Sequence, residues 1–175
     1  MLAPYTGGSA QSLRFATDTL GKRRLRNERL RHRLHFSVSR SDERCIVAVT
    51  RAGAVGVDVE ARVIALPGAE GLIRRLAPEE TADLRAVNAC DRVDAILRCW
   101  TRKEAYLKAT GTGLAVALEH CAVSTGDDAR VVRAVAGDAD AWLLRDLELD
   151  EAHLGALALR CGARSVDIRQ RVLEW

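Results

Sequence analysis

The segment Val55-Gly56-Val57-Asp58-Val59-Glu60 alternates strictly along its length, and it constrains the fold more than any other stretch of the chain. Side chains at positions i and i+2 of a β-strand lie on the same face of a sheet. The three valines are therefore predicted to enter a core, while Asp58 and Glu60 project together from the opposite face. A chain with this pattern is expected to build at least one sheet.

The paired acids of this segment suggest a cation site. Neighbouring carboxylates repel each other unless a cation lies between them. Hard oxygen ligands favour Mg²⁺ or Mn²⁺, and Mg²⁺ usually completes its coordination with waters and substrate phosphates. Solvated acids on a half-exposed strand are the structural alternative, and the segment alone leaves both interpretations open.

A helix is predicted from about Asp91 to Ala109, because apolar residues recur there at helical spacing and Gly111 follows as a stop signal. Glu104 and Lys108 are four residues apart and share one face of this helix. They form either an ordinary ion pair, worth a few tenths of a kcal/mol, or part of a site for a phosphate ligand and its metal.

Several shorter elements complete the prediction. The strands at 45–50 and 54–60 are expected to form a hairpin through Arg51-Ala52-Gly53, because glycine can supply the positive φ that such a turn needs. The first dozen residues are expected to be irregular. Further helices are predicted at 67–76 and from Pro78, and further strands at 35–39, 115–124, 141–147 and 153–160.

Positive charge is concentrated near the N-terminus. The net charge is only +3, yet between Arg14 and Arg33 eight bases stand against two acids. A phosphate-rich ligand or a polyanion could bind such a segment, and a solvated basic loop is the alternative.

The composition of the chain argues against several classes of protein. Aromatic residues make up only 4% of the chain, which argues against a base-stacking platform for single-stranded nucleic acid. No apolar run approaches the roughly 20 residues needed to cross a bilayer. The five cysteines are scattered without a C-x-x-C pair, which argues against a zinc or redox site. We expect a cytoplasmic protein with reduced thiols.

Four blocks in the same order resemble the Sfp-type 4'-phosphopantetheinyl transferases. The family's G-[IV]-D-[IV]-E block stands as Gly56 to Glu60, and its W-[ST]-x-K-E-A-x-x-K-x-x-G-x-G-L block stands as Trp100 to Leu114. The F-[NS]-x-S-H-S block is Phe36 to Ser41, with Arg40 in place of the histidine. The G-K-P block is Gly21-Lys22-Arg23, with arginine in place of the proline. The resemblance covers roughly residues 5 to 160.

This resemblance implies an α+β fold of two pseudo-twofold-related lobes with mainly antiparallel sheets and coenzyme A at their interface. The N-terminal lobe, residues 1–62, would carry the Asp58 strand and is expected to be shortened, because family members usually have a further N-terminal segment. The C-terminal lobe, residues 63–175, would carry the Glu104 helix.

The implied activity is transfer of the 4'-phosphopantetheine group of coenzyme A to a serine of an acyl or peptidyl carrier protein, with release of adenosine 3',5'-bisphosphate. Such carriers serve fatty acid, polyketide or nonribosomal peptide biosynthesis. By resemblance, Mg²⁺, with Mn²⁺ as the alternative, would be held by Asp58, Glu60 and Glu104. Glu104 as base and Lys108 would be catalytic. The implied coenzyme A site comprises Lys22, Ser39, Arg40, Asp58, Lys103 and Lys108.

Two other functions stay open at this point. One is a degenerate module that binds coenzyme A or a carrier protein without turnover. The other is a Mg²⁺-dependent nucleic-acid-processing protein that uses the basic segment on backbone phosphates. For the transferase we expect a monomer that binds neither nucleic acid nor membranes.

Overall fold

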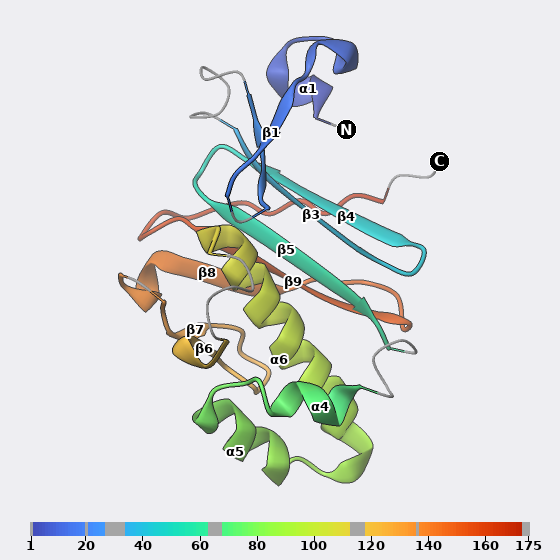
Figure 1. Ribbon diagram of the computed structural model, residues 1–175, viewed down its shortest axis with the longest axis vertical. Coiled ribbons are helices and arrows are strands. Elements are labelled where there is room, and N and C mark those ends of the chain that lie inside the picture. The colour runs from blue at the N-terminus through green and yellow to red at the C-terminus, as the bar shows by residue number, and fades with distance from the viewer. Residues whose placement is uncertain are drawn as a thin grey trace.

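The computed structural model describes residues 2–19, 21–26, 34–62, 68–112, 118–135 and 137–172. Its elements form an α+β fold in which one long helix, α6 (Ala89–Thr110), crosses a three-stranded antiparallel sheet (Figure 1). The sheet has the strand order β5-β9-β8, with β5 spanning Val55–Ala61, β9 His153–Arg160 and β8 Trp142–Asp146.

Smaller elements surround this unit, and none of the described helices is long and apolar enough to cross a lipid bilayer. Three two-stranded antiparallel pairs accompany the central sheet. They are β1 (Phe15–Thr17) with β2 (Arg23–Leu25), β3 (His35–Ser41) with β4 (Arg44–Thr50), and β6 (Ala122–Val123) with β7 (Val131–Arg133). The remaining helices are α1 (Ala3–Thr6), α4 (Ala69–Ile73) and α5 (Pro78–Ala86), with 3-10 turns at Ala10–Ser12, Leu118–His120 and Ala139–Ala141.

The long helix and the strands at 142–146 and 153–160 lie where the sequence predicts them. Gly111 ends α6 with a φ of 76°, in the left-handed region. The predicted strand at 115–124 is wrong in its described part, because residues 118–120 form a 3-10 turn and only Ala122–Val123 are extended. Its first residues lie outside the described part of the chain.

The predicted hairpin between residues 45–50 and 54–60 is wrong. β4 pairs with β3 instead, through a tight turn in which Asp42 has a φ of 51°, and β5 pairs with β9. Gly53 does not have a positive φ. Its role is close approach, since a Cβ at this position would lie 2.1 Å from the carbonyl oxygen of Arg160.

Gly56 lets α6 pack directly on β5. A Cβ at Gly56 would lie 2.0 Å from the carbonyl oxygen of Ala105 and 2.5 Å from the amide nitrogen of Ala109. Any side chain would therefore separate the helix from the strand. The close contact brings the acid of β5, Asp58, next to the polar face of α6.

Side chains of β3 join its hairpin to the other edge of β5. Serines alternate along β3, so their hydroxyls share one face of the strand. They accept hydrogen bonds from β5 backbone N–H groups: Ser37 from Val57 at 3.1 Å, Ser39 from Val59 at 3.4 Å and Ser41 from Ala61 at 3.0 Å. The donors of β5 at this edge are thus satisfied without a backbone ladder.

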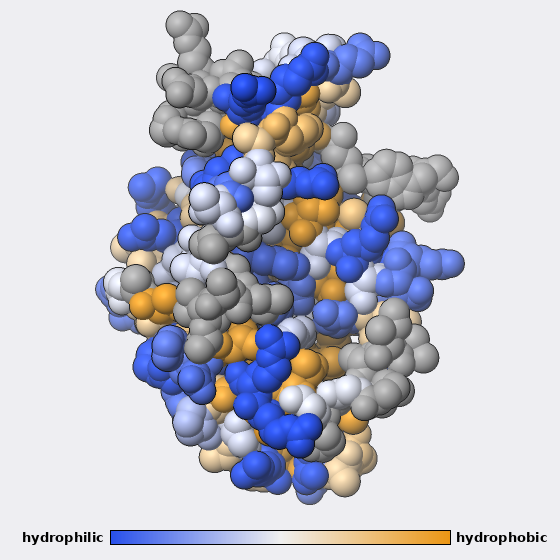
Figure 2. Space-filling model, viewed as in Figure 1, coloured by the Kyte–Doolittle hydropathy of each residue, from blue (hydrophilic) through white to orange (hydrophobic). Residues whose placement is uncertain are grey.

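The main core fills the space between α6 and the sheet, where Ile96, Tyr106, Leu107, Leu144 and Ala158 are buried. A second, smaller cluster lies under β2 and β3. On the face drawn in Figure 2, apolar surface over β3 and β4 alternates with hydrophilic side chains.

The predicted lobe boundary at residue 62 stays a prediction. Strands from both sides of it, β5 and β9, share the central sheet.

Candidate active site

Asp58, Ser39 and Lys108 meet where three elements converge. Lys108 Nζ on α6 lies 2.6 Å from Asp58 Oδ1 on β5, and it also donates to Ser39 Oγ on β3 at 2.9 Å. The Ser39 hydroxyl donates to Asp58 Oδ1 at 2.9 Å. Three residues that are far apart in the sequence therefore form one hydrogen-bonded group.

The carboxyl of Asp58 is almost fully buried. Burial raises its pKa to about 6, and the Lys108 ammonium offsets part of this shift. Its second oxygen, Oδ2, has no hydrogen-bond partner among the described residues. A buried, unpartnered carboxylate oxygen is costly for a folded protein, so Oδ2 is a candidate ligand atom.

Glu104 lies on the same face of α6 as Lys108. Burial raises its pKa to about 7, the negative charge of Asp58 adds to the shift, and Lys108 and Arg75 oppose it. Its Oε1 atom is buried and also lacks a partner within the described structure. A shared cation would stabilise both Glu104 and the neighbouring carboxylate that raises its pKa.

Glu60 lies two residues after Asp58 on β5, on the same face of the strand, and is half-buried. Its Oε2 accepts a hydrogen bond from Ser41 Oγ at 3.1 Å. In the described part of the chain, no three acidic, histidine or cysteine side chains are arranged as a ready metal site. The unpartnered oxygens of Asp58 and Glu104 fit a hard divalent cation, and the assignment of Glu60 as a third ligand stays a prediction.

A cleft of about 560 Å³ opens beside this group. Lys22, Ser39, Arg40 and Lys108, predicted from three separate stretches to bind coenzyme A, all line it. Cations thus outnumber anions on its walls. The remaining lining residues are Gly21, Arg23, Phe36, Ser37, Val38, Cys45, Leu107 and Gly111.

Lys22 lines the cleft but points its ammonium at the end of α6. Nζ donates to the carbonyl oxygens of Lys108 and Ala109, the latter at 3.0 Å, and lies 3.4 Å from that of Val55. A cation at a helix C-terminus satisfies free carbonyls and complements the helix dipole. Burial lowers the pKa of Lys22 to about 8. Lys22 therefore anchors the β1–β2 hairpin to α6.

Lys103 does not lie where the resemblance places it. Its side chain is fully buried, and Nζ pairs with Glu80 Oε2 of α5 and donates to the carbonyl oxygen of Cys121 at 2.7 Å. Glu80 also accepts from the N–H groups of Ala77 and Val123, both at 2.8 Å. A role of Lys103 beside the diphosphate is thus corrected to that of a structural anchor, because its ammonium is enclosed by these partners.

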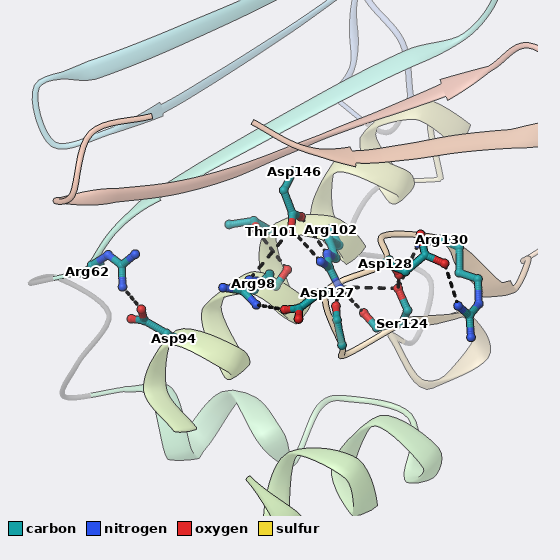
Figure 3. A network of polar contacts seen from close by, with 11 residues as sticks. Arg62, Asp94, Arg98, Thr101, Arg102, Ser124, Asp127, Asp128, Arg130 and Asp146 are labelled. Carbon is teal, nitrogen blue, oxygen red and sulfur yellow. Dashed lines mark hydrogen bonds and ion pairs between the residues drawn. The ribbon is translucent and has the colours of Figure 1, made fainter. Parts of the chain in front are cut away.

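Arg102, immediately before Lys103, anchors the other flank of α6 (Figure 3). Its buried guanidinium binds Asp146 of β8 through two hydrogen bonds of 2.7 and 2.6 Å. It also donates to the carbonyl oxygens of Ser124 and Gly126, both at 2.7 Å. Arg102 and Lys103 therefore fix the rotation of α6 that directs Glu104 towards Asp58.

Comparison with known proteins agrees with this arrangement. Residues 54–158, which include both β5 and α6, match the family model of the 4'-phosphopantetheinyl transferase superfamily. The chain belongs to this superfamily. The 4'-phosphopantetheinyl transferase of Bacillus subtilis is 28% identical over 121 residues, which cover 69% of this chain and 52% of the relative. The 4'-phosphopantetheinyl transferase HetI of Nostoc is 30% identical over 161 residues, or 91% of this chain and 65% of the relative.

The chain thus spans about half to two thirds of the length of these curated relatives. Among solved structures, a holo-(acyl-carrier-protein) synthase from Bacillus anthracis, determined in complex with CoA (3',5'-ADP), matches with a TM-score of 0.52 and 16% identity. The match covers 63% of this chain and 96% of that chain. It confirms the predicted phosphopantetheinyl transferase-like α+β fold with antiparallel sheets.

Sequence reasoning missed several residues that build the site. Ser37 and Ser41 hold β5 as Ser39 does, and the alternation of serines within 36–41 was the available signal. Glu80 and Arg102 looked like ordinary exposed charges of helices. Only their complete burial identifies them as anchors.

Proposed function

We propose that this chain transfers the 4'-phosphopantetheine group of coenzyme A to a serine of an acyl or peptidyl carrier protein. The observation that carries the proposal is the contact of Lys108 with Asp58 and Ser39, beside Glu104 and at a cation-lined cleft. Family membership gives the reaction class, since the matched residues include every member of this group except Ser39.

The reaction exchanges one P–O bond for another. The serine oxygen of the carrier bonds to the phosphorus that bears the pantetheine arm, and the bond from that phosphorus to the bridging diphosphate oxygen breaks. Adenosine 3',5'-bisphosphate leaves with the electron pair. Such transfer depends on positioning and charge neutralisation more than on covalent chemistry of the protein.

Lys108 and Glu104 take the two central roles. The Lys108 ammonium, fixed by Asp58 and Ser39, neutralises charge on the diphosphate oxygens. The Glu104 carboxylate accepts the proton of the serine hydroxyl. A carboxyl whose pKa is raised to about 7 is well matched to proton transfer near neutral pH.

A divalent cation completes the proposal. Asp58 and Glu104, with Glu60 as the third candidate, would hold Mg²⁺ or Mn²⁺, which would supply further positive charge at the diphosphate. The protein contributes the donor oxygens Asp58 Oδ2 and Glu104 Oε1, both buried without a partner in the described structure.

The direct test incubates the full chain with coenzyme A, Mg²⁺ and several apo carrier proteins, and measures the carrier mass. We expect a phosphopantetheine increment on a carrier serine, abolished by a chelator and restored by Mg²⁺. Absence of the increment on every carrier overturns the proposal. Coenzyme A binding that persists in that case supports a binding module without turnover.

A further inference from the structure

Strand β4 has one unpaired edge. It pairs with β3 along its whole length and with no other described strand. Ser41 and Arg44 close a two-residue loop, so they form a hydrogen-bonded pair, and such pairs alternate along the ladder. The backbone N–H and C=O groups of Cys45, Val47 and Val49 therefore point away from β3. No described residue forms a backbone hydrogen bond with them.

The sequence of β4 lacks the devices that protect exposed strand edges. It reads Arg-Cys-Ile-Val-Ala-Val-Thr, without proline or lysine, and its ladder with β3 contains no bulge. The one charged residue within it, Arg44, is bound to Asp150 in the turn before β9. Long, apolar and unpaired edges of this kind readily pair with another strand.

Open space runs along this edge. A groove of about 380 Å³ is lined by every residue from 43 to 50. Its opposite wall includes the C-terminal segment 166–172, which forms no backbone hydrogen bond with β4. On the face of the hairpin opposite to the serines that bind β5, Val47 lies beside Val38, whose side chain is 46% exposed. Both the edge and the apolar face next to it are thus accessible to a partner.

The edge of β4 is complementary to itself. In an antiparallel pair of two β4 strands centred on Val47, the outward backbone groups of Cys45 meet those of Val49 of the partner subunit. The same register places Glu43, in the turn before β4, opposite Arg51 of the partner subunit, which directly follows β4. Both of these charged residues are exposed.

Charge selects this register among those that hydrogen bonding allows. A shift by two residues keeps the outward backbone groups in contact, because the ladder repeats every two residues. It places either Glu43 or Arg51 opposite a valine, however, and the opposite-charge pairs are lost. The register centred on Val47 forms the pair at both ends of the interface, since twofold symmetry repeats it.

We propose that two copies of this chain associate through antiparallel pairing of their β4 strands, which joins the two β3–β4 hairpins into one four-stranded sheet. The contact uses the same residues on both copies, so association closes at a dimer and removes both unpaired edges. The inference does not depend on the proposed reaction. It replaces the monomer that is expected from the sequence.

The first test measures the mass of the full chain in solution. Sedimentation equilibrium is run from about 1 to 200 μM, the range of moderate affinities that suits a small interface. A reductant is present because the cysteines are free thiols. We expect the mass to rise from that of one chain towards that of two, and not beyond. A mass of one chain throughout, or a mass that passes two chains, overturns the inference.

A charge exchange tests the register. Glu43→Arg and Arg51→Glu each bring like charges together across the interface, so each should weaken the dimer by about 10-fold or more. The variant with both changes restores opposite charges and should recover the affinity. Asp140→Arg, at an exposed acid outside β4, should leave the affinity unchanged. No recovery in the double variant, or an equal effect of Asp140→Arg, refutes the register.

Hydrogen exchange tests which surface forms the contact. The amides of Ile46 and Ala48 are already bonded to β3 within one copy, whereas those of Cys45, Val47 and Val49 gain partners only in the dimer. Protection of these three amides should therefore rise with protein concentration. A dimer that leaves them unprotected uses another surface, and protection that is independent of concentration assigns the edge to segment 166–172 of the same chain. Either result overturns the inference.

Discussion

Lys108 Nζ lies 2.6 Å from Asp58 Oδ1, and this contact joins the last turn of α6 to the middle of β5. The Lys108 side chain keeps 33% of its surface exposed while that of Asp58 keeps 5%. The lysine therefore connects a buried carboxylate with the open cleft. The carboxylate fixes the ammonium beside the cleft.

Replacement of this carboxylate should stop transfer without unfolding the protein. Asp58→Asn keeps the shape of the side chain but removes the charge that fixes Lys108 and the candidate ligand atom for Mg²⁺. We expect carrier modification to slow by about 100-fold or more, with an unchanged circular dichroism spectrum. Asp140→Asn, which alters an exposed acid, is the control. Full activity of Asp58→Asn would refute the assignment.

Two serines of β3 separate a structural from a catalytic effect. Ser39→Ala and Ser37→Ala each leave a β5 N–H group without its acceptor, so each should lower the free energy of unfolding by about 1–3 kcal/mol. Only Ser39 also contacts Lys108 and Asp58. Ser39→Ala alone should therefore slow carrier modification under conditions where both variants are folded. Equal turnover of the two variants would contradict this.

The buried pair of Lys103 and Glu80 should control stability. Lys103→Met leaves Glu80 charged and buried, which should cost about 3–5 kcal/mol of unfolding free energy in urea titrations. Lys103→Met with Glu80→Gln should recover part of this loss. A stable Lys103→Met variant with weakened coenzyme A binding would instead restore the role of Lys103 as a phosphate ligand.

Gly56 should tolerate no side chain. In Gly56→Ala the new methyl group would overlap backbone atoms of Ala105 and Ala109, so α6 would have to move away from β5. We expect a loss of about 3 kcal/mol or more in unfolding free energy. Gly126→Ala is the matched control, because a Cβ there would meet no atom within 4 Å. A stable Gly56→Ala protein would contradict the close packing.

Stability without divalent cations should fall as the pH rises from 5 to 8. Burial raises the pKa of Asp58 to about 6 and that of Glu104 to about 7, from 3.8 and 4.5. At pH values between the ordinary and the raised pKa of each carboxyl, the native state binds more protons than the unfolded chain. The slope of unfolding free energy against pH is therefore negative. Urea titrations at several pH values measure this slope.

The variant Asp58→Asn with Glu104→Gln should flatten that slope and be more stable than the unchanged protein at pH 8. Glu151→Gln, at an exposed acid, should leave the slope unchanged. Identical slopes in the unchanged protein and the double variant would show that the two carboxyls do not titrate as proposed.

The sequence predicted the long helix and the strands β8 and β9 because their periodicity is local. It failed at the pairing of β5, since an alternating pattern gives the faces of a strand but does not name its neighbours. A short connection through Gly53 favoured a hairpin with β4. In the structure β9, about 100 residues further along the chain, takes that place, and its Ala156 and Ala158 are buried in the core with residues of α6.

The residues of the candidate site also divide into those that the sequence predicted and those that it did not. Spacing alone put Asp58 with Glu60 and Glu104 with Lys108, and the resemblance to the family was needed to predict that the strand and the helix contribute to one site. Arg102 and Lys103 directly precede Glu104 on the same helix, and their type gave no sign that they are anchors. Their burial depends on α5, β8 and the chain near Ser124, which fold against α6 from elsewhere in the sequence.

The sequence by itself therefore determined the long helix, the strands β5, β8 and β9 and the family, because these follow from local patterns and ordered motifs. The tertiary structure decided which charges are available to a ligand. Lys22 and Lys103 are held by protein atoms, whereas Arg23 and Arg40 are exposed without a described partner. The physical reason is that the availability of a charge depends on its neighbours in space, and only the packing of distant segments sets those neighbours.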